Sequence, residues 1–294
     1  MKSIRYWLNL FIAAVSFVLL GILAGTLVFT SHWTKSVLHP HSPVPTGDLF
    51  IAEDIPFENV NLRTEDGLKL SAWYTPPQNG AVILIAHGYN DNRPESIYAM
   101  FVENGYGVLA WDFRAHGGSD GDLSTLGYYE RMDVEAALTF ALAQEGVEHV
   151  GAWGGSMGAA TIILAAAESP EIEALVADSA YPSLEDVMRL NMPVRFFQPF
   201  TLFFGEYYSG AEIDNVNPEV VIPEISPRPV FVIDGWEGGA IAMNSPYRLY
   251  KAANEPKEIW VEDDVPHLGM FARYPNKYEN KVIQFFDIWL LNKK

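Results

Sequence analysis

The sequence predicts an α/β protein in which a mostly parallel central sheet carries helices on both faces, preceded by one transmembrane helix. Two observations favour this fold. From about residue 58, short apolar runs alternate with longer amphipathic segments, which is the pattern of strands and helices that build a parallel sheet. The first 30 residues instead contain an apolar run long enough to cross a bilayer.

Segment 1–30 is expected to be an uncleaved membrane anchor. The run Tyr6–Thr30 is nearly all apolar, whereas a cleaved signal peptide has an apolar core of ~7 to 15 residues followed by a small-residue site. Lys2 and Arg5 precede the run and favour a cytoplasmic N-terminus. We therefore expect a single-pass protein of the cell membrane whose folded domain is extracytoplasmic.

Residues 31–57 contain several prolines and no periodicity, so they are expected to form a linker that lifts the domain from the membrane. His39 and His41 lie in this segment. Two histidines in a loop are more often solvated residues than metal ligands.

One domain is expected over 58–294. A hairpin turn at Glu65-Asp66-Gly67 separates its first two strands. Continuous apolar runs predict strands that are buried on both faces. The further strands are expected at 81–86, 107–112, 172–178, 230–233 and 258–261, and helices at 95–104, 123–145 and 274–291.

Segment 181–227 interrupts this alternation and is too long for a simple loop. It follows the strand after Ser156, so it is expected to form a helical cap above that serine. Phe196, Phe200 and Phe204 would then contribute to an apolar substrate pocket. The alternative is a packed helical pair whose aromatic residues are only core.

The run Gly154-Gly155-Ser156-Met157-Gly158 stands between an apolar strand and a small-residue helix. The pattern Gly-x-Ser-x-Gly in this context is typical of a nucleophile elbow, in which a strained turn exposes the serine hydroxyl. Ser156 is therefore the candidate nucleophile. The backbone N–H of Met157 would lie at a helix N-terminus, where developing negative charge is stabilised.

His267 is the candidate general base, because it is the one histidine of seven that follows Ser156 and it lies just past the last expected strand. His87-Gly88-Tyr89 ends an early strand, so the Tyr89 N–H would join that of Met157 in an oxyanion hole. His87 and the turn around Asp112, Arg114 and His116 are interpreted as scaffold.

Three motifs, at 87–93, 112–117 and 154–160, together resemble the α/β-hydrolases. They are most similar to the membrane-associated branch related to serine aminopeptidase-like and Bem46-like hydrolases. The resemblance covers about residues 58–294 and implies an α/β-hydrolase fold. It implies an ester, thioester, amide or lipid substrate without choosing among them.

The catalytic acid departs from the family pattern. The resemblance implies an Asp after the seventh strand, but the run Ile233-Asp234-Gly235-Trp236-Glu237-Gly238 has glycine at that place. Glu237 is favoured because its longer side chain could reach the histidine. Asp178 is the second candidate, Asp234 the third, and the absence of any acid is a further alternative.

The composition of the chain excludes several classes of partner and of catalytic site. Because 37 acidic residues face 19 basic ones, the net charge of −18 argues against a nucleic-acid partner. The absence of cysteine excludes disulfides, thiolate metal sites and a cysteine nucleophile.

The leading hypothesis is a membrane-anchored serine hydrolase that cleaves a small-molecule or lipid-like acyl ester or thioester through an acyl-enzyme, without metal or organic cofactor. The alternatives are a catalytically impaired binding or scaffold protein on the same fold, and a serine peptidase or amidase.

Overall fold

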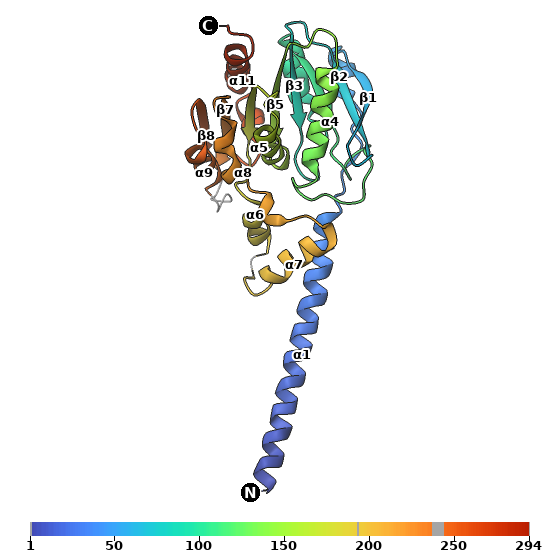
Figure 1. Cartoon of the computed structure of the whole chain (residues 1–294), viewed down its shortest axis with the longest axis vertical. Helices are drawn as coiled ribbons and strands as arrows, with labels where there is room; N and C mark the ends of the chain where they lie inside the picture. Colours follow the sequence, from blue (N-terminus) through green and yellow to red (C-terminus); the bar gives the residue numbers. More distant parts are fainter. Residues whose placement is uncertain (1, 193, 237–243, 294) are drawn as a thin grey trace.

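The structure is a computed structural model that describes residues 2–192, 194–236 and 244–293. A long helix, α1 (Lys2–Leu38), projects from one end of an α/β domain that holds the C-terminus at its far end (Figure 1). The following helices belong to the domain: α2 (Asp48–Glu53), α3 (Glu95–Glu103), α4 (Glu130–Leu142), α5 (Met157–Glu168), α6 (Leu184–Asn191), α7 (Gln198–Ser209), α8 (Pro218–Val221), α9 (Ser245–Ala252), α10 (Met270–Arg273) and α11 (Pro275–Trp289).

The central sheet confirms the predicted architecture. Its strand order is β1-β2-β4-β3-β5-β6-β7-β8; β1 and β2 pair antiparallel, β2 and β4 pair antiparallel, and the remaining neighbours are parallel. The strands are β1 (Glu58–Arg63), β2 (Lys69–Thr75), β3 (Ala81–Ala86), β4 (Gly107–Trp111), β5 (His149–Gly155), β6 (Ala174–Asp178), β7 (Val230–Trp236) and β8 (Lys257–Asp263).

Two apolar cores cover the two faces of the sheet. One contains α4, α5 and α9, and the other contains α2, α3 and α11. Strand β3 is fully buried along its whole length, as its uninterrupted apolar run predicts. The carboxyl ends of parallel strands meet at one edge of such a sheet, which is where α/β proteins place their binding sites.

The helix expected over 123–145 begins later, at Glu130. Residues before it form a loop in which Leu126 and Gly127 have positive φ angles of 55° and 121°. These are left-handed conformations that a helix cannot contain, so periodicity alone placed the boundary too early.

The segment 31–57, expected to be a linker, begins inside a helix and then contacts the domain. Helix α1 continues without a break to Leu38. The segment after it lies against the domain, since the His41 amide donates to Asn90 Oδ1 at 2.8 Å and the amides of Gly47 and Leu49 donate to Glu95 at 3.0 and 2.9 Å. This segment is therefore packed along the domain surface rather than a free tether.

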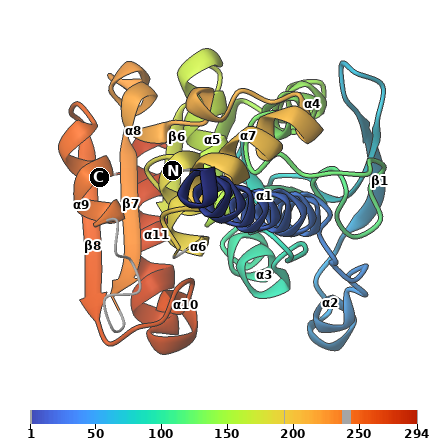
Figure 2. The same ribbon diagram turned by 90° about the horizontal axis from the view of Figure 1, so that it is seen from below.

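The segment expected to form a cap folds into α6, α7 and α8, with short 3₁₀ turns between and after them. Helices α6 and α7 lie at the end of the domain from which α1 emerges (Figure 1). Viewed from below, α1 emerges beside α7, and α6 lies near it (Figure 2). The helix nearest the N-terminus and the inserted helices thus share one end of the molecule.

Candidate active site

Ser156 sits at the sharp turn between β5 and α5. Its backbone has φ 52° and ψ −113°, a strained conformation for a non-glycine residue. The turn demands glycine on both sides, because a Cβ at Gly158 would lie 2.1 Å from the Ala86 carbonyl oxygen and one at Gly154 would lie 2.6 Å from the Ala159 nitrogen. Ser156 thus lies on a strained turn between a strand and a helix, and its role as a nucleophile stays a prediction.

His267 faces this serine from the loop after β8. Its Nε2 lies 2.9 Å from Ser156 Oγ, within hydrogen-bond distance. The residue is at the solvent-exposed rim of the site, yet the surrounding protein displaces enough water from the imidazole to lower the pKa of His267 below its ordinary value of 6.5. A neutral imidazole nitrogen beside a serine hydroxyl can accept its proton.

Asp178 is close to this pair but does not contact the histidine. Its Oδ2 accepts a hydrogen bond from Tyr278 Oη at 2.7 Å, and its Oδ1 accepts one from Ser179 Oγ at 2.8 Å. The Ser179 hydroxyl in turn accepts the Leu268 amide at 3.1 Å. Asp178 is therefore connected to the loop that carries His267 through Ser179, a residue that sequence reasoning missed.

Asp234 lines the same cavity as Ser156 and His267. It is buried, and its Oδ1 has no hydrogen-bond partner among the described residues. Burial, and next the charge of Asp178, raises the pKa of Asp234 to about 7. Glu237, the favoured acid, and Gly238 lie outside the described residues. Within the described part of the chain, no carboxylate hydrogen-bonds to the histidine ring.

Tyr89 and Met157 line the same cavity as Ser156, and their role as oxyanion-hole donors stays a prediction. Met157 is the first residue of α5, so its amide belongs to the unpaired helix N-terminus. The Tyr89 hydroxyl donates to the Val37 carbonyl of α1 at 2.6 Å. This bond connects the loop after β3 directly to the N-terminal helix.

A cavity of about 540 Å³ opens in front of Ser156. Its walls are mostly apolar and come from three parts of the chain. Helix α1 contributes Trp33 and Val37, helix α6 contributes Val187, Met188, Leu190 and Asn191, and the ends of strands with the loops and helix starts beside them supply the rest. The contribution of α1 could not be foreseen from an anchor expected to end at residue 30.

The comparisons with known proteins agree with this geometry. Residues 77–222 match the model of a family described as "Hydrolase_4: Serine aminopeptidase, S33". An esterase of Pyrococcus furiosus, Pf2001, superposes with a TM-score of 0.70 at 26% identity, covering 86% of this chain and 98% of the esterase. This chain is a member of the α/β-hydrolase superfamily.

Two bacterial relatives of the hydrolase extend over most of its length. YqkD of Bacillus subtilis is 26% identical over 235 residues, which cover 75% of this chain and 76% of the relative. YfhR of Escherichia coli K12 is 25% identical over 241 residues, which cover 78% and 80%. Both are described as uncharacterized proteins, so they support the fold and not a substrate.

The aromatic residues of α7 do not occupy the place expected of them in this hydrolase. None of Phe196, Phe200 and Phe204 is among the described residues that line the cavity. The reason is the orientation of α7, which buries its polar and small residues, including Gln198 and Thr201, against the domain. The pocket expectation for these three phenylalanines is therefore wrong.

The residues interpreted as scaffold do have structural partners. His87 is buried, its Nε2 accepts the Phe113 amide at 2.9 Å, and burial lowers the pKa of His87 to about 3. Asp112 binds Arg93 at 3.1 Å in an ion pair that is buried on both sides. His116 is also buried. These groups hold the two loops beside the elbow and lie outside the reacting pair.

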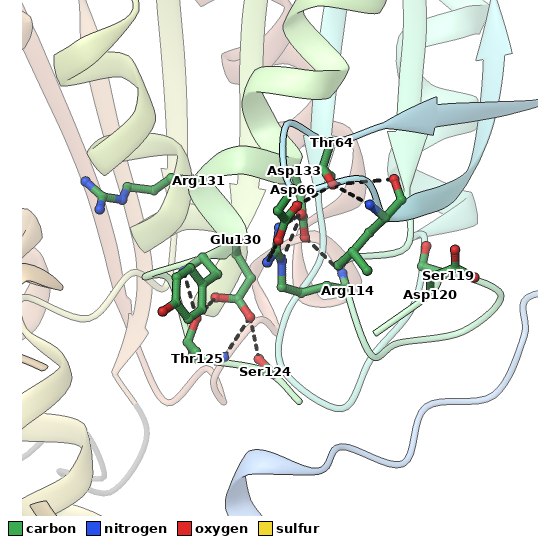
Figure 3. A network of polar contacts seen from close by, with 12 residues as sticks. Thr64, Asp66, Arg114, Ser119, Asp120, Ser124, Thr125, Glu130, Arg131 and Asp133 are labelled. Carbon is green, nitrogen blue, oxygen red and sulfur yellow. Dashed lines mark hydrogen bonds and ion pairs between the residues drawn. The ribbon is translucent and has the colours of Figure 1, made fainter. Parts of the chain in front are cut away.

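A second buried polar network fixes the loop before α4 (Figure 3). Glu130 Oε1 accepts from Ser124 Oγ and the Thr125 amide at 2.9 and 2.8 Å, while Oε2 accepts from Thr125 Oγ1 and the Gly127 amide at 2.6 and 2.8 Å. The loop carries Leu126, which lines the cavity. Sequence reasoning missed Glu130, because the helix expected over 123–145 placed this glutamate in its interior, where a charged side chain is usually solvated.

Beside the hydrogen bonds of Glu130, the side chain of Arg114 bridges two carboxylates (Figure 3). Its guanidinium binds Asp133 at 2.7 Å and Asp66 at 2.9 Å. Asp66 belongs to the β1–β2 hairpin turn, so this pair of bonds connects the hairpin, the turn after β4 and helix α4. Among the described residues, no group of three or more metal-ligating side chains is close enough to hold a metal ion.

Proposed function

We propose that the protein is a membrane-anchored serine hydrolase that cleaves a carboxylic ester or thioester through an acyl-enzyme intermediate. The observation that carries the proposal is the 2.9 Å approach of His267 Nε2 to Ser156 Oγ on a strained elbow. A serine hydroxyl is a weak nucleophile unless an adjacent base accepts its proton. Support comes from the similarity to the Pyrococcus furiosus esterase at 26% identity.

The two steps follow from this geometry. Ser156 Oγ attacks the acyl carbon while its proton passes to His267 Nε2, and the amides of Tyr89 and Met157 stabilise the oxyanion. The histidine then protonates the leaving alcohol or thiol, and the bond from the acyl carbon to that group breaks. Water, deprotonated by the same imidazole, attacks the acyl-serine and releases the carboxylic acid and the free serine.

The anchor belongs to this proposal as well. Helix α1 is the one helix in the described chain that is long and apolar enough to cross a membrane. Its apolar side chains from Ile4 to Leu20 are exposed in the structure. We propose a single span with the N-terminus in the cytoplasm and the hydrolase domain on the other side, since Lys2 and Arg5 precede the span.

The test is labelling of the full-length protein in detergent with a fluorophosphonate probe, which reacts with an activated serine regardless of substrate. We expect rapid labelling of the native protein, none of Ser156→Ala, and full labelling of Ser96→Ala, a control at an exposed serine. A folded native protein that is not labelled would contradict the proposal.

A non-catalytic binding protein is the second candidate. It is favoured by the fact that no described carboxylate hydrogen-bonds to the His267 ring. Without an orienting acid, the imidazole loses its preferred tautomer and the rate falls by orders of magnitude. The same labelling experiment decides, because this candidate predicts a folded protein with an unreactive serine.

A peptidase or amidase is the third candidate. The description of the matching family names a serine aminopeptidase, and Asp234 places a carboxylic acid side chain among the residues that line the cavity, where it could pair with a substrate ammonium group. Hydrolysis of a matched pair, an ester and an amide with the same acyl group, separates this candidate from an esterase.

A further inference from the structure

Helix α7 and the turn before it expose aromatic side chains, which a helix on the surface of a water-soluble domain would normally bury. Phe203 and Tyr207 lie four residues apart with stacked rings, and they are 57% and 70% exposed; Phe196, just before the helix, is 57% exposed. We call these three side chains the α7 aromatic face. The buried side of the helix consists of Gln198, Thr201 and Gly205. Large aromatic side chains exposed together on one element indicate an apolar partner.

The position of α7 along α1 indicates which partner. The ring of Phe197 lies 5.3 Å from that of Phe29 on α1, and Tyr208, near the other end of α7, reaches Ser31 with its hydroxyl at 2.6 Å. Helix α7 therefore lies beside the last residues of the apolar run Tyr6–Thr30. Both views agree on this placement (Figures 1 and 2).

The length of the apolar run in α1 indicates the depth in the bilayer at which α7 lies. The run Tyr6–Thr30 contains 25 residues, which span about 37 Å at the rise of an α-helix, against about 30 Å for the hydrocarbon core of a bilayer. Phe29 therefore falls at the boundary between hydrocarbon and headgroups. Aromatic residues, tyrosine among them, concentrate at this depth because their rings are apolar and their edges polar.

The cavity in front of Ser156 borders the same region. Trp33 of α1 and Leu190 of α6 both line it, and Leu190 is 43% exposed at the end of α6 that leads toward α7. The apolar cavity wall thus continues into the exposed apolar surface of the two helices. An apolar molecule lying in the membrane would meet the cavity without crossing water.

We propose that the α7 aromatic face lies in the interface of a lipid bilayer, and that the substrate is a lipid ester that enters the cavity from the membrane between α1 and α6. The part of this proposal that concerns the substrate rests on the proposed hydrolase function. The net charge of −18 repels anionic headgroups, so the contact is apolar and forms on zwitterionic phosphatidylcholine.

The first test locates α7 without reference to activity. Because the chain has no cysteine, Phe203→Cys can carry a single nitrobenzoxadiazole label, with Leu142→Cys as a control of similar exposure (49%) on α4. The full-length proteins are reconstituted in phosphatidylcholine vesicles. We expect headgroup-depth spin-labelled lipid to quench the label at 203 at least twofold more than the label at 142.

Equal quenching of the two labels would overturn the membrane placement. Protection of the label at 203 from both spin-labelled lipid and aqueous iodide would also overturn it, because a protein would then cover the face.

The second test concerns the substrate. The double variant Phe203→Ser/Tyr207→Ser should hydrolyse a short water-soluble ester within twofold of the native rate, and a long-chain ester in phosphatidylcholine vesicles at least tenfold more slowly. Leu142→Ser/Ile288→Ser, also at exposed apolar positions, should change neither rate. Equal effects of the variant on both substrates would overturn entry from the membrane.

The variant Ser156→Ala distinguishes a failure of the proposed hydrolase function from a failure of the proposed membrane placement. Hydrolysis that persists in Ser156→Ala would contradict the proposed function, while the quenching comparison would still decide the place of α7.

Discussion

The imidazole of His267 is the residue whose environment most directly sets the behaviour of the site. Partial loss of hydration disfavours its charged form and lowers its pKa. A general base works only when neutral, so a lower pKa extends activity toward acid. The bond to Ser156 is already formed in the resting protein.

We predict that the acidic limb of the kcat/KM profile has its midpoint below pH 6.5, the ordinary value for histidine. The sign follows because activity is lost as pH falls through the pKa of the base, and burial moves that pKa down. The measurement is hydrolysis of a soluble ester whose own ionisation does not change over pH 4 to 8. A midpoint well above 6.5 would show that a carboxylate beside the imidazole, of which Glu237 is the favoured candidate, raises the pKa of His267 by more than burial lowers it.

Substitution of the three acid candidates distinguishes their roles. We predict that Glu237→Gln lowers kcat by roughly 10²- to 10⁴-fold, since an uncharged partner neither fixes the tautomer nor stabilises the imidazolium. Asp178→Asn is the matched control, because both carboxylate oxygens of Asp178 are bonded elsewhere; its loss should stay below tenfold. A larger loss in Asp234→Asn than in Glu237→Gln would assign the acid to Asp234.

At the scale of elements, the sequence is most informative where local sterics decide the structure. The elbow was predictable because Gly154 and Gly158 have neighbours that exclude a Cβ. The sheet was predictable because buried parallel strands require uninterrupted apolar runs. The place of His267 followed from chain order alone.

Other features were not predictable, for physical reasons. The aromatic residues near Phe200 and Phe204 have the same pattern whether they face a protein core or a lipid surface, so the orientation of α7 could not be derived. The α1 residues Trp33 and Val37 lie beyond the apolar run but within the same helix. The acid could not be assigned because glycine stands at position 238, where the family pattern has Asp.

The loop before α4 offers a prediction about stability. Glu130→Gln keeps the size of the side chain but leaves one oxygen for four donors, so at least two buried donors lose their acceptor (Figure 3). We expect the free energy of unfolding to fall by about 2–4 kcal/mol. Denaturant unfolding of the detergent-solubilised protein measures it.

The control for this prediction is Glu145→Gln, an exposed glutamate just past the end of α4, which should change stability by less than about 0.5 kcal/mol. Equal stabilities of the two variants would mean that water or the loop itself replaces the lost acceptors.

At the scale of the whole molecule, the open question is the side of the membrane on which the domain lies. The absence of native cysteine permits a direct test. We predict that Glu145→Cys in intact cells reacts with a membrane-impermeant maleimide, whereas Ser3→Cys, which keeps both Lys2 and Arg5, reacts only after permeabilisation. The reverse pattern would place the hydrolase domain in the cytoplasm and contradict the orientation inferred from Lys2 and Arg5.

Because residues of α1 line the cavity, this helix is part of the binding site as well as the expected membrane anchor. A chain cut after Leu38 would lose Trp33 and Val37 from the cavity and the acceptor of the Tyr89 hydroxyl. In the domain released by such a cut, one side of the binding site would be open to water. Its substrate selectivity would therefore differ from that of the anchored protein. Exchanging the anchor for the span of another protein would likewise alter substrate selectivity, so anchor and catalytic domain are not interchangeable parts.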